Sequence, residues 1–579
     1  MIEITMRPTN VLGQKLEFKK TKADYTLYVV GAVCLVFLCV FFIFPVAAIG
    51  LKSLRNSEGV FVGLTNYASF LSTPTALELT RNSLQVSSIA TVIAVALAFT
   101  YAAFLAQTRV PFRGFFRIIA LAPMLAPSLY SALSVVRVFG NQGIAKSLMG
   151  EHSIYGPIGI VLCDVFYTFP SAFLIILTAF KALDARLYDA ATMLGAGKIR
   201  AFLTVTLPNA KYGLISAICI VFTMNITDFG IPKVIGGQFS VFPTEVYRQV
   251  IGQQNFELGG VISALLLLPS VLTFLITRSI GQNHQASGAT RQPAKPTEST
   301  ILAALGLIFC GAIALFILGV FAIGIGASFV KFWPYNLSLG LSNFDFSSKT
   351  DIGWAAIGNS IIMASGACIF GTVLSLATAY CIERNTLCPS FTSLLQALAI
   401  VPSAVPGLVI GLGYLMFFTS QNNPLSFLYG TTVVLIICSI VHFFTVSTLT
   451  FQTALKKIDA NFESVSSSLG VSTFSLFKRV ILPMLAPTIV DVAAYFFVST
   501  MCTVSAIILL YRPNTVTATI GIVGLDDNGS VAAAAAMGSV VVLVCVTARV
   551  LEHLIRRRFE AGKAASEPEA TPEVSAAVL

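Results

Sequence analysis

Twelve long apolar stretches restrict the fold of this chain more than any other feature of its sequence. A helix of about 20 residues crosses the ~30 Å hydrocarbon core of a bilayer, so stretches of this length are typical of membrane-spanning helices. They cover roughly residues 27–50, 83–107, 115–138, 157–180, 212–233, 258–280, 301–330, 355–381, 391–418, 429–453, 488–510 and 531–552. The pattern predicts an all-α polytopic membrane protein with about twelve transmembrane helices.

The composition supports the same class. Apolar residues make up 56% of the chain and charged residues only 11%, whereas soluble domains contain about 25% charged residues. Soluble enzymes and nucleic-acid-binding proteins are therefore poor candidates, although the formal net charge is +10. Placing both termini in the cytoplasm puts most Lys and Arg residues on that side, as the positive-inside rule requires. This distribution accounts for the basic charge without any nucleic acid.

The spans fall into two groups of six, separated by a polar, Pro-containing break. We divide the chain into a cytoplasmic N-terminal segment (1–24), a first domain (25–280), a linker (281–300), a second domain (301–558) and a cytoplasmic tail (559–579). The acidic, Pro-containing composition of the tail is typical of disorder.

Metal or disulfide chemistry has little support in the sequence. Most of the 11 Cys residues lie inside apolar stretches without a C-x-x-C pair, which is typical of small buried hydrophobic residues. The 4 His residues are too far apart to form a local metal motif. A metal site assembled from distant helices is the alternative, but we expect no catalytic residue, metal or cofactor on this chain.

The two groups of spans repeat one another. Pairs of prolines recur in the third span of each group, and a polar loop recurs between the fourth and fifth spans. The matching residues are Pro123 and Pro127 with Pro402 and Pro406, Asp184 with Asp459, Gly195 with Gly470, and Leu207-Pro208 with Leu482-Pro483. Chance similarity between apolar helices would not align polar loops, so each half is interpreted as one unit of a pseudo-two-fold pore.

The repeated loop has the pattern of a short amphipathic helix. Apolar residues of the first copy recur at helical spacing and share one side: Leu183, Leu187, Ala190, Ala191 and Leu194. Gly195 suits a left-handed helix end, and Pro208 suits the first turn of the next span. Such a helix either docks into a groove of a partner or packs on the membrane surface or its own bundle.

This loop resembles the coupling loop of binding-protein-dependent ABC importer permeases, whose signature is Glu-Ala-Ala, then Gly, then Leu-Pro. The first copy has Asp189-Ala190-Ala191, Gly195 and Leu207-Pro208. The second copy has Ser464-Val465-Ser466 in place of the triplet, with Glu463 one place earlier, and keeps Gly470 and Leu482-Pro483. Both halves of the chain share the resemblance, which is to the subfamily of fused permeases of the 2-aminoethylphosphonate and ferric-iron importers.

The resemblance implies a type I permease with two pseudo-symmetric six-helix domains in a bacterial inner membrane. It also implies two kinds of partner: a dimer of separate ATP-binding subunits, which holds the ATP and Mg²⁺, and a periplasmic solute-binding protein. The residues agree that this chain hydrolyses nothing, because no G-x-x-x-x-G-K-[ST] phosphate loop occurs.

Ionisable residues in or near the spans are candidates for the substrate path, because charges inside a membrane are costly. An anionic solute needs a cation on its route, and Arg137 is the first choice, with Lys233 at the outer mouth. The remaining candidates are Asp164, Asp228, which could meet an amine or pair with Arg137, and Asp491. Interhelical ion pairs, or side chains that reach the membrane surface, are the alternative interpretation.

The cargo is harder to predict than the class. Residues 223–260 are similar to the corresponding stretch of 2-aminoethylphosphonate permeases, but spacing and charge do not separate a phosphonate from ferric iron. A secondary transporter is the alternative class, although its repeats commonly supply ion-binding residues at the midplane, which are few here. A membrane enzyme would need clustered His, Asp or Glu in the spans, which the sequence lacks.

Overall fold

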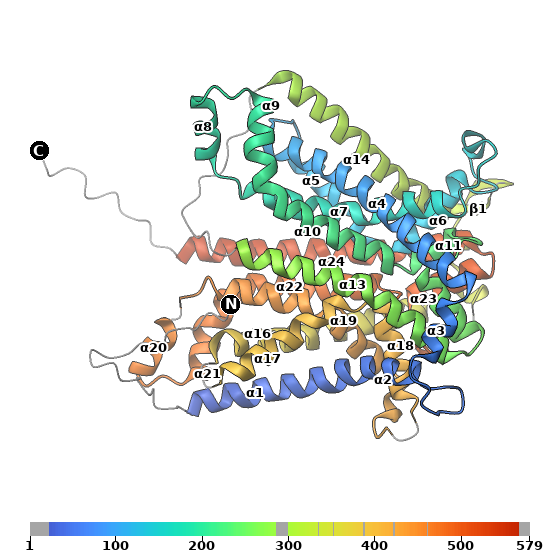
Figure 1. Ribbon diagram of the computed structural model, residues 1–579. Helices are drawn as coiled ribbons and strands as arrows, with labels where there is room; N and C mark the ends of the chain where they lie inside the picture. The colour runs from blue at the N-terminus through green and yellow to red at the C-terminus, as the bar shows by residue number, and fades with distance from the viewer. Residues whose placement is uncertain are drawn as a thin grey trace, which may run out of the picture.

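The computed structural model describes residues 22–284 and 299–566, apart from 334, 351, 386, 387, 421, 422 and 460. The N-terminal segment up to 21, most of the linker and the tail from 567 lie outside the described residues, and the domain division stays a prediction. Ten helices in the described part are long and apolar enough to cross a membrane, and two bent helix pairs raise the number to 12 if each pair is one span. Apart from one short strand hairpin, the described part of the chain is a bundle of helices, which confirms the predicted fold class (Figure 1).

The helices before the linker are α1 (Lys22–Leu38), α2 (Phe44–Ser53), α3 (Thr65–Leu71), α4 (Pro74–Gln107), α5 (Arg113–Leu121), α6 (Ser128–Phe139), α7 (Pro157–Lys181), α8 (Ala185–Met193), α9 (Lys198–Ala201), α10 (Leu207–Thr227), α11 (Gly230–Ile235), α12 (Phe242–Tyr247) and α13 (Phe256–His284). After the linker follow α14 (Thr300–Phe329), α15 (Ala355–Gly366), α16 (Thr372–Arg384), α17 (Pro389–Ile400), α18 (Gly407–Phe418), α19 (Thr432–Leu455), α20 (Asn461–Ser468), α21 (Thr473–Leu476), α22 (Leu482–Cys502), α23 (Ala518–Asp527) and α24 (Val531–Ser566). Strands β1 (Val330–Phe332) and β2 (Asn336–Leu339) form an antiparallel hairpin between α14 and α15.

The third span of each half is bent instead of straight. Helices α5 and α6 meet at 100° and α17 and α18 at 109°. The bend follows from the repeated prolines, because a residue before proline is driven out of the helical region. Ala126, before Pro127, has φ −116° and ψ 144°, and Val405, before Pro406, has φ −106° and ψ 121°. The predicted spans 115–138 and 391–418 thus each correspond to a bent helix pair.

The fifth and eleventh spans begin and end earlier than predicted, at 202–227 and 474–502. The expected boundary at the Leu-Pro dipeptide is bridged by a single π-turn, Phe202–Thr206 in one half and Phe477–Ile481 in the other. In each case the N–H of the Leu donates to the carbonyl five residues earlier, as a π-turn requires. A proline ring clashes with the carbonyl four residues before it, and the wider turn keeps the helix continuous through Pro208 and Pro483.

The first span of each half packs against the other half. Helix α1 packs on α16 and α17, and α2 packs on α18, where the Tyr414 hydroxyl donates to the Phe41 carbonyl at 2.5 Å. In return α14 packs on α4, α5 and α6, and its Cys310, Ala314 and Ile317 join the buried core of the first half. The exchange is visible in Figure 1, where α1 runs along the second half and α14 along the first.

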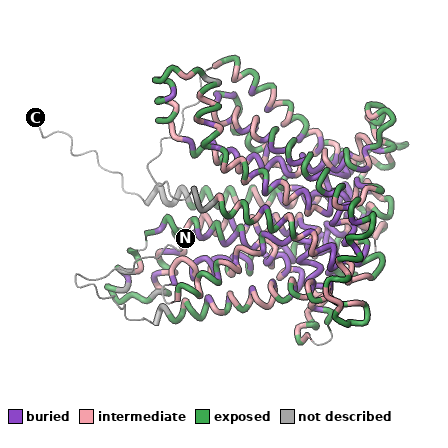
Figure 2. Tube along the Cα trace, in the orientation of Figure 1, coloured by how far each residue is buried: buried purple, intermediate pink, exposed green. Residues whose placement is uncertain are grey.

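The two halves share one core at one end of the bundle and have separate cores at the other. We call these the α11/α23 end and the α8/α20 end, after the helices that mark them in Figure 1. The shared core joins residues of both halves, such as Leu129 and Phe229 with Leu408 and Leu510. Toward the α8/α20 end, Phe173 and Phe451 belong to different clusters. Figure 2 accordingly shows buried residues concentrated toward the α11/α23 end.

Candidate functional site

The repeated loops form short helices, α8 and α20, at the same end of the bundle and on opposite sides of it (Figure 1). Asp184 and Asp459 cap them, each accepting a hydrogen bond from the backbone N–H two residues on, at 3.1 and 3.0 Å. Gly195 has φ +72° and Gly470 φ +68°, which confirms the predicted left-handed helix ends. In each loop the N–H of the following residue closes the turn at 2.9 Å, as in a Schellman motif.

The bundle covers only some of the apolar residues that the sequence pattern of the first loop grouped on one side. Leu183 and Ala191 are buried against the bundle, whereas Leu187 and Ala190 are exposed. Met193 and Leu194 are 89% and 84% exposed. The second loop is similar, and its exposed apolar side chains include Val465, Leu469 and Phe474. Both loops therefore hold to the bundle with one side and present an apolar surface with the other.

The acidic residues of the two loops lie in different environments. Asp189 is exposed, while the hydroxyl of its neighbour Tyr188 shares a 2.6 Å hydrogen bond with that of Thr206. In the internal repeat, Glu463 of the second loop corresponds to Tyr188 of the first. Its Oε1 lies 3.1 Å from Nε of Arg384 in an ion pair without hydrogen-bond alignment. Arg384 also donates to the Ile458 carbonyl at 2.9 Å. Glu463 thus anchors α20 and does not replace Asp189.

Replacing Glu463 by glutamine is expected to loosen α20. Arg384 would keep its backbone partner but lose the carboxylate, and the loss of ~1 kcal/mol corresponds to roughly fivefold faster amide exchange in α20. Hydrogen exchange followed by mass spectrometry measures this directly. Asp189→Asn, which removes an exposed charge from α8, serves as the control and should leave exchange in both loop helices unchanged. Equal exchange in Glu463→Gln and the parent chain would refute the anchoring role.

Two of the predicted path residues lie together near the bend of the third span. Asp228 follows α10, and its carboxylate accepts a 2.8 Å hydrogen bond from the N–H of Ile231. Burial raises the pKa of Asp228 to about 6, against the opposing effect of hydrogen bonds from Ile231, Ser128 and Gly230. Asp164 of α7 is within electrostatic reach of Asp228. It is 1% exposed, and neither oxygen of its side chain has a hydrogen-bond partner.

The other two predicted residues of the first half lie at the α11/α23 end, facing carboxylates of the second half. Nζ of Lys233 lies 3.0 Å from Oδ1 of Asp527. Arg137 is within electrostatic reach of Asp526 and Tyr155 and does not pair with Asp228. Burial and the neighbouring Asp527 raise the pKa of Asp526 to about 6, while Lys233 and Arg137 oppose the rise. Sequence analysis missed both carboxylates, because Asp526-Asp527-Asn528-Gly529 has the composition of a surface turn.

Asp491 lies apart from these residues. Its carboxylate is 3.3 Å from Arg556 of α24 in a half-exposed ion pair, which matches the alternative interpretation of an interhelical pair. Its place on a substrate path stays a prediction.

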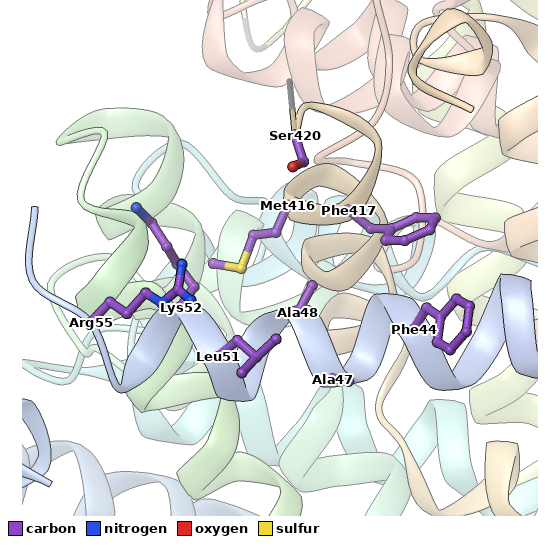
Figure 3. A pocket seen from close by; sticks show the side chains of 9 residues that line it. All are labelled: Phe44, Ala47, Ala48, Leu51, Lys52, Arg55, Met416, Phe417 and Ser420. Atoms are coloured by element: carbon purple, nitrogen blue, oxygen red, sulfur yellow. The ribbon is translucent and has the colours of Figure 1, made fainter. Parts of the chain in front are cut away.

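A cavity of about 400 Å³ lies at the seam between α2 and α18 (Figure 3). Its walls are mostly apolar, and Lys52 and Arg55 stand at its rim. Lys52 is paired with Glu257 at 2.8 Å. None of the predicted path residues lines this cavity, which belongs to the contact between the exchanged first span and the second half. In the described part of the chain, no group of three or more His, Cys, Asp or Glu side chains is placed to hold a metal ion.

Comparisons with known proteins agree with the repeated architecture. A family model for the binding-protein-dependent transport system inner membrane component matches residues 90–286 and 371–561. A ferric transport system permease protein of Actinobacillus pleuropneumoniae is 25% identical over 540 residues, which are 89% of this chain and 77% of that protein. Both matched segments begin after the exchanged first span of their half.

Two further relatives carry other names. A protein of Salmonella paratyphi A, named for a 2-aminoethylphosphonate transport system permease, is 34% identical over 159 residues, 27% of this chain and 57% of that protein. A thiamine transport system permease protein of Brucella abortus is 24% identical over 338 residues, 55% of this chain and 58% of that protein. The names of these relatives therefore all describe transport system permeases but differ in the transported solute.

Proposed function

We propose a cargo and a set of partners for this chain on the premise that it belongs, in two fused copies, to the binding-protein-dependent transport system inner membrane component family. The chain is a multi-pass permease of an ABC importer. Its proposed cargo is 2-aminoethylphosphonate. Its proposed partners are a dimer of ATP-binding subunits in the cytoplasm and a periplasmic solute-binding protein, across a bacterial inner membrane with both chain termini in the cytoplasm.

The observation that carries this proposal is the pair of loop helices, α8 and α20, at one end of the bundle. Each begins at a capping Asp, ends at a left-handed Gly, and exposes apolar side chains that no other described residue covers. An exposed apolar side of a short helix favours docking in a groove. Two such helices, one from each half, suit a dimeric partner with two grooves. ATP hydrolysis in that partner would move α8 and α20 and so rock the halves, as alternating access requires.

Support for a phosphonate cargo comes from charge and from local similarity. Arg137 and Lys233 offer two cations at the α11/α23 end, which faces the periplasm in this proposal. Arg and Lys are the side chains that bind phosphate-like anions. The 34% identity to the 2-aminoethylphosphonate relative is higher than that to the ferric relative, although it covers less of the chain.

Ferric iron is the second candidate cargo, favoured by the 89% of this chain that the ferric relative covers. The deciding experiment compares cells with and without this gene for uptake of labelled 2-aminoethylphosphonate and of iron. Loss of phosphonate uptake alone supports the proposal, and loss of iron uptake alone transfers the cargo to the second candidate. Uptake that survives ATP depletion but collapses with the ion gradient would instead indicate a secondary transporter and overturn the ATP-driven mechanism.

A further inference from the structure

Four charged side chains meet between the two halves at the α11/α23 end. The first half supplies only cations, Arg137 of α6 and Lys233 of α11, and the second half supplies only carboxylates, Asp526 and Asp527 of α23. The Lys233–Asp527 ion pair measures 3.0 Å and joins residues that are 294 positions apart. Both cations of this cluster therefore come from the first half and both carboxylates from the second. If the halves move apart at this end, the cations and the carboxylates move apart with them.

The position of the carboxylates is unfavourable for α23 itself. Asp526 and Asp527 occupy its last turn, where the helix dipole is negative and acidic side chains are destabilising. Arg137 and Lys233 occupy the last turns of α6 and α11, where cations are favourable. The two carboxylates thus depend on the cations of the other half, whereas the cations are well placed without them. Local conflicts of this kind are expected at functional or strained sites.

The arrangement is not inherited from the internal repeat. The third spans of the two halves are related by an offset of 279 residues, so Met416 corresponds to Arg137. The later segments are related by an offset of 275, so Ile508 corresponds to Lys233, and Ile251 and Gly252 correspond to Asp526 and Asp527. None of these equivalents is charged. A contact that served only to hold the halves together could have been repeated on both sides of the pseudo-two-fold axis, but these four charges occur on one side.

The surroundings suit recognition of an anion. Nε of Arg137 is buried without a hydrogen-bond partner, so the guanidinium keeps unused donor capacity at this site. Nζ of Lys233 lies 5.6 Å from the ring centre of Tyr247, a distance at which the ring stabilises the ammonium. Tyr155 lies within electrostatic reach of both Arg137 and Asp526. Two cations with aromatic neighbours and spare N–H donors match a phosphonate or phosphate group, which carries up to two negative charges.

We propose that Arg137 and Lys233 form an anion-binding site at this mouth, and that Asp526 and Asp527 occupy the site while the mouth is closed. Opening of the α11/α23 end withdraws the carboxylates and frees the cations for the phosphonate group of the solute. Closing returns the carboxylates, which compete with the solute and release it toward the path. The proposal rests on the proposed function for the direction of transport and the anionic cargo, but not for the charge exchange itself.

The decisive comparison uses Asp527→Asn and Lys233→Gln, because both break the same ion pair while only the second removes a cation. The full chain is studied with its partner subunits in lipid nanodiscs, and hydrogen exchange is measured over α11 and α23. A partly exposed pair is worth up to ~1 kcal/mol, so both variants should exchange up to about fivefold faster. Methylphosphonate, against sodium chloride of equal ionic strength, is then added as the probe.

The expected result is a divergence between the variants. Methylphosphonate should slow exchange in Asp527→Asn toward the parent rate, because the freed cations bind it, and should have little effect on Lys233→Gln. Lys52→Gln breaks the 2.8 Å pair with Glu257 at the same end and should leave α11 and α23 unchanged. An equal response of the two variants to methylphosphonate, or parent-like exchange in both, would overturn the proposal.

Uptake of labelled 2-aminoethylphosphonate separates this proposal from the proposed cargo. If the cargo is right, Lys233→Gln cells should lose most of the uptake, because a solute-binding cation is gone. Asp527→Asn cells should lose less, because both cations stay and Asp526 remains to compete with the solute. If parent cells take up no 2-aminoethylphosphonate while the exchange results diverge as described, the cargo is wrong and the anion site stands. If the parent takes up the solute but both variants lose uptake equally, the pair is only a structural contact.

Discussion

Replacing Gly195 by aspartate is expected to abolish solute uptake while the chain still inserts and folds. The strain of a side chain at φ +72° is modest, about 1–2 kcal/mol. A β-carbon added to Gly195 meets no other atom within 4 Å, so the substitution causes no clash inside the chain. The new carboxylate, however, stands beside the exposed side chains of Met193 and Leu194. Burying it unpaired in the proposed contact with the ATP-binding subunit would cost ~3–5 kcal/mol.

Gly195→Asn is the matched control for this prediction. Asparagine tolerates the left-handed region better than other side chains and adds nearly the same volume as aspartate without the charge. We expect Asn to retain a substantial part of the uptake and Asp to retain none. Co-purification of the ATP-binding subunit should fall in parallel with uptake, whereas the amount of chain in the membrane should not. Normal uptake by Gly195→Asp would refute the coupling role of α8.

The same glycine shows how far the sequence could predict this loop. A left-handed residue after a short amphipathic helix has a local cause, so Gly195 and Gly470 were placed correctly from spacing alone. Which apolar side chains of the loop the bundle buries, and which stay exposed to solvent, was not predictable from spacing. Helical periodicity places Leu187 and Leu194 with Leu183, but only the packed structure decides which of them the bundle covers.

In the transmembrane part too, local features could be predicted from the sequence and tertiary contacts could not. Hydropathy predicted the spans because each crosses the membrane as a local unit. The bend at Pro127 had a visible signal in the paired prolines, whose ring geometry excludes a straight helix. The exchange of α1 and α14 between the halves had none, because the surface of an apolar helix does not specify its neighbour. The partnership of Lys233 with Asp527 was hidden for a similar reason, since tertiary packing alone joins them.

Replacing Asp164 by serine is expected to stabilise the chain and to abolish uptake. Asp164 is 1% exposed and neither of its carboxyl oxygens has a hydrogen-bond partner. An unsatisfied buried polar group costs ~1–3 kcal/mol, and more when it is charged. The other half offers a precedent, because Ser439 occupies the equivalent position and its hydroxyl donates to the Leu435 carbonyl of its own helix at 2.9 Å. Serine at 164 can satisfy itself in the same way, so folding should gain ~1–3 kcal/mol.

Loss of uptake is expected because the buried Asp164 carboxyl costs folding free energy without a structural partner. We propose that Asp164, a buried carboxyl without a hydrogen-bond partner and within electrostatic reach of Asp228, takes part in passing the solute. Thermal unfolding in nanodiscs and uptake in cells measure the two effects separately. Asp491→Ser is the control of opposite sign, since it breaks the 3.3 Å pair with Arg556 and should lower stability by at most ~1 kcal/mol. If Asp164→Ser raised stability and left uptake intact, Asp164 would be a structural residue and the path would have to run elsewhere.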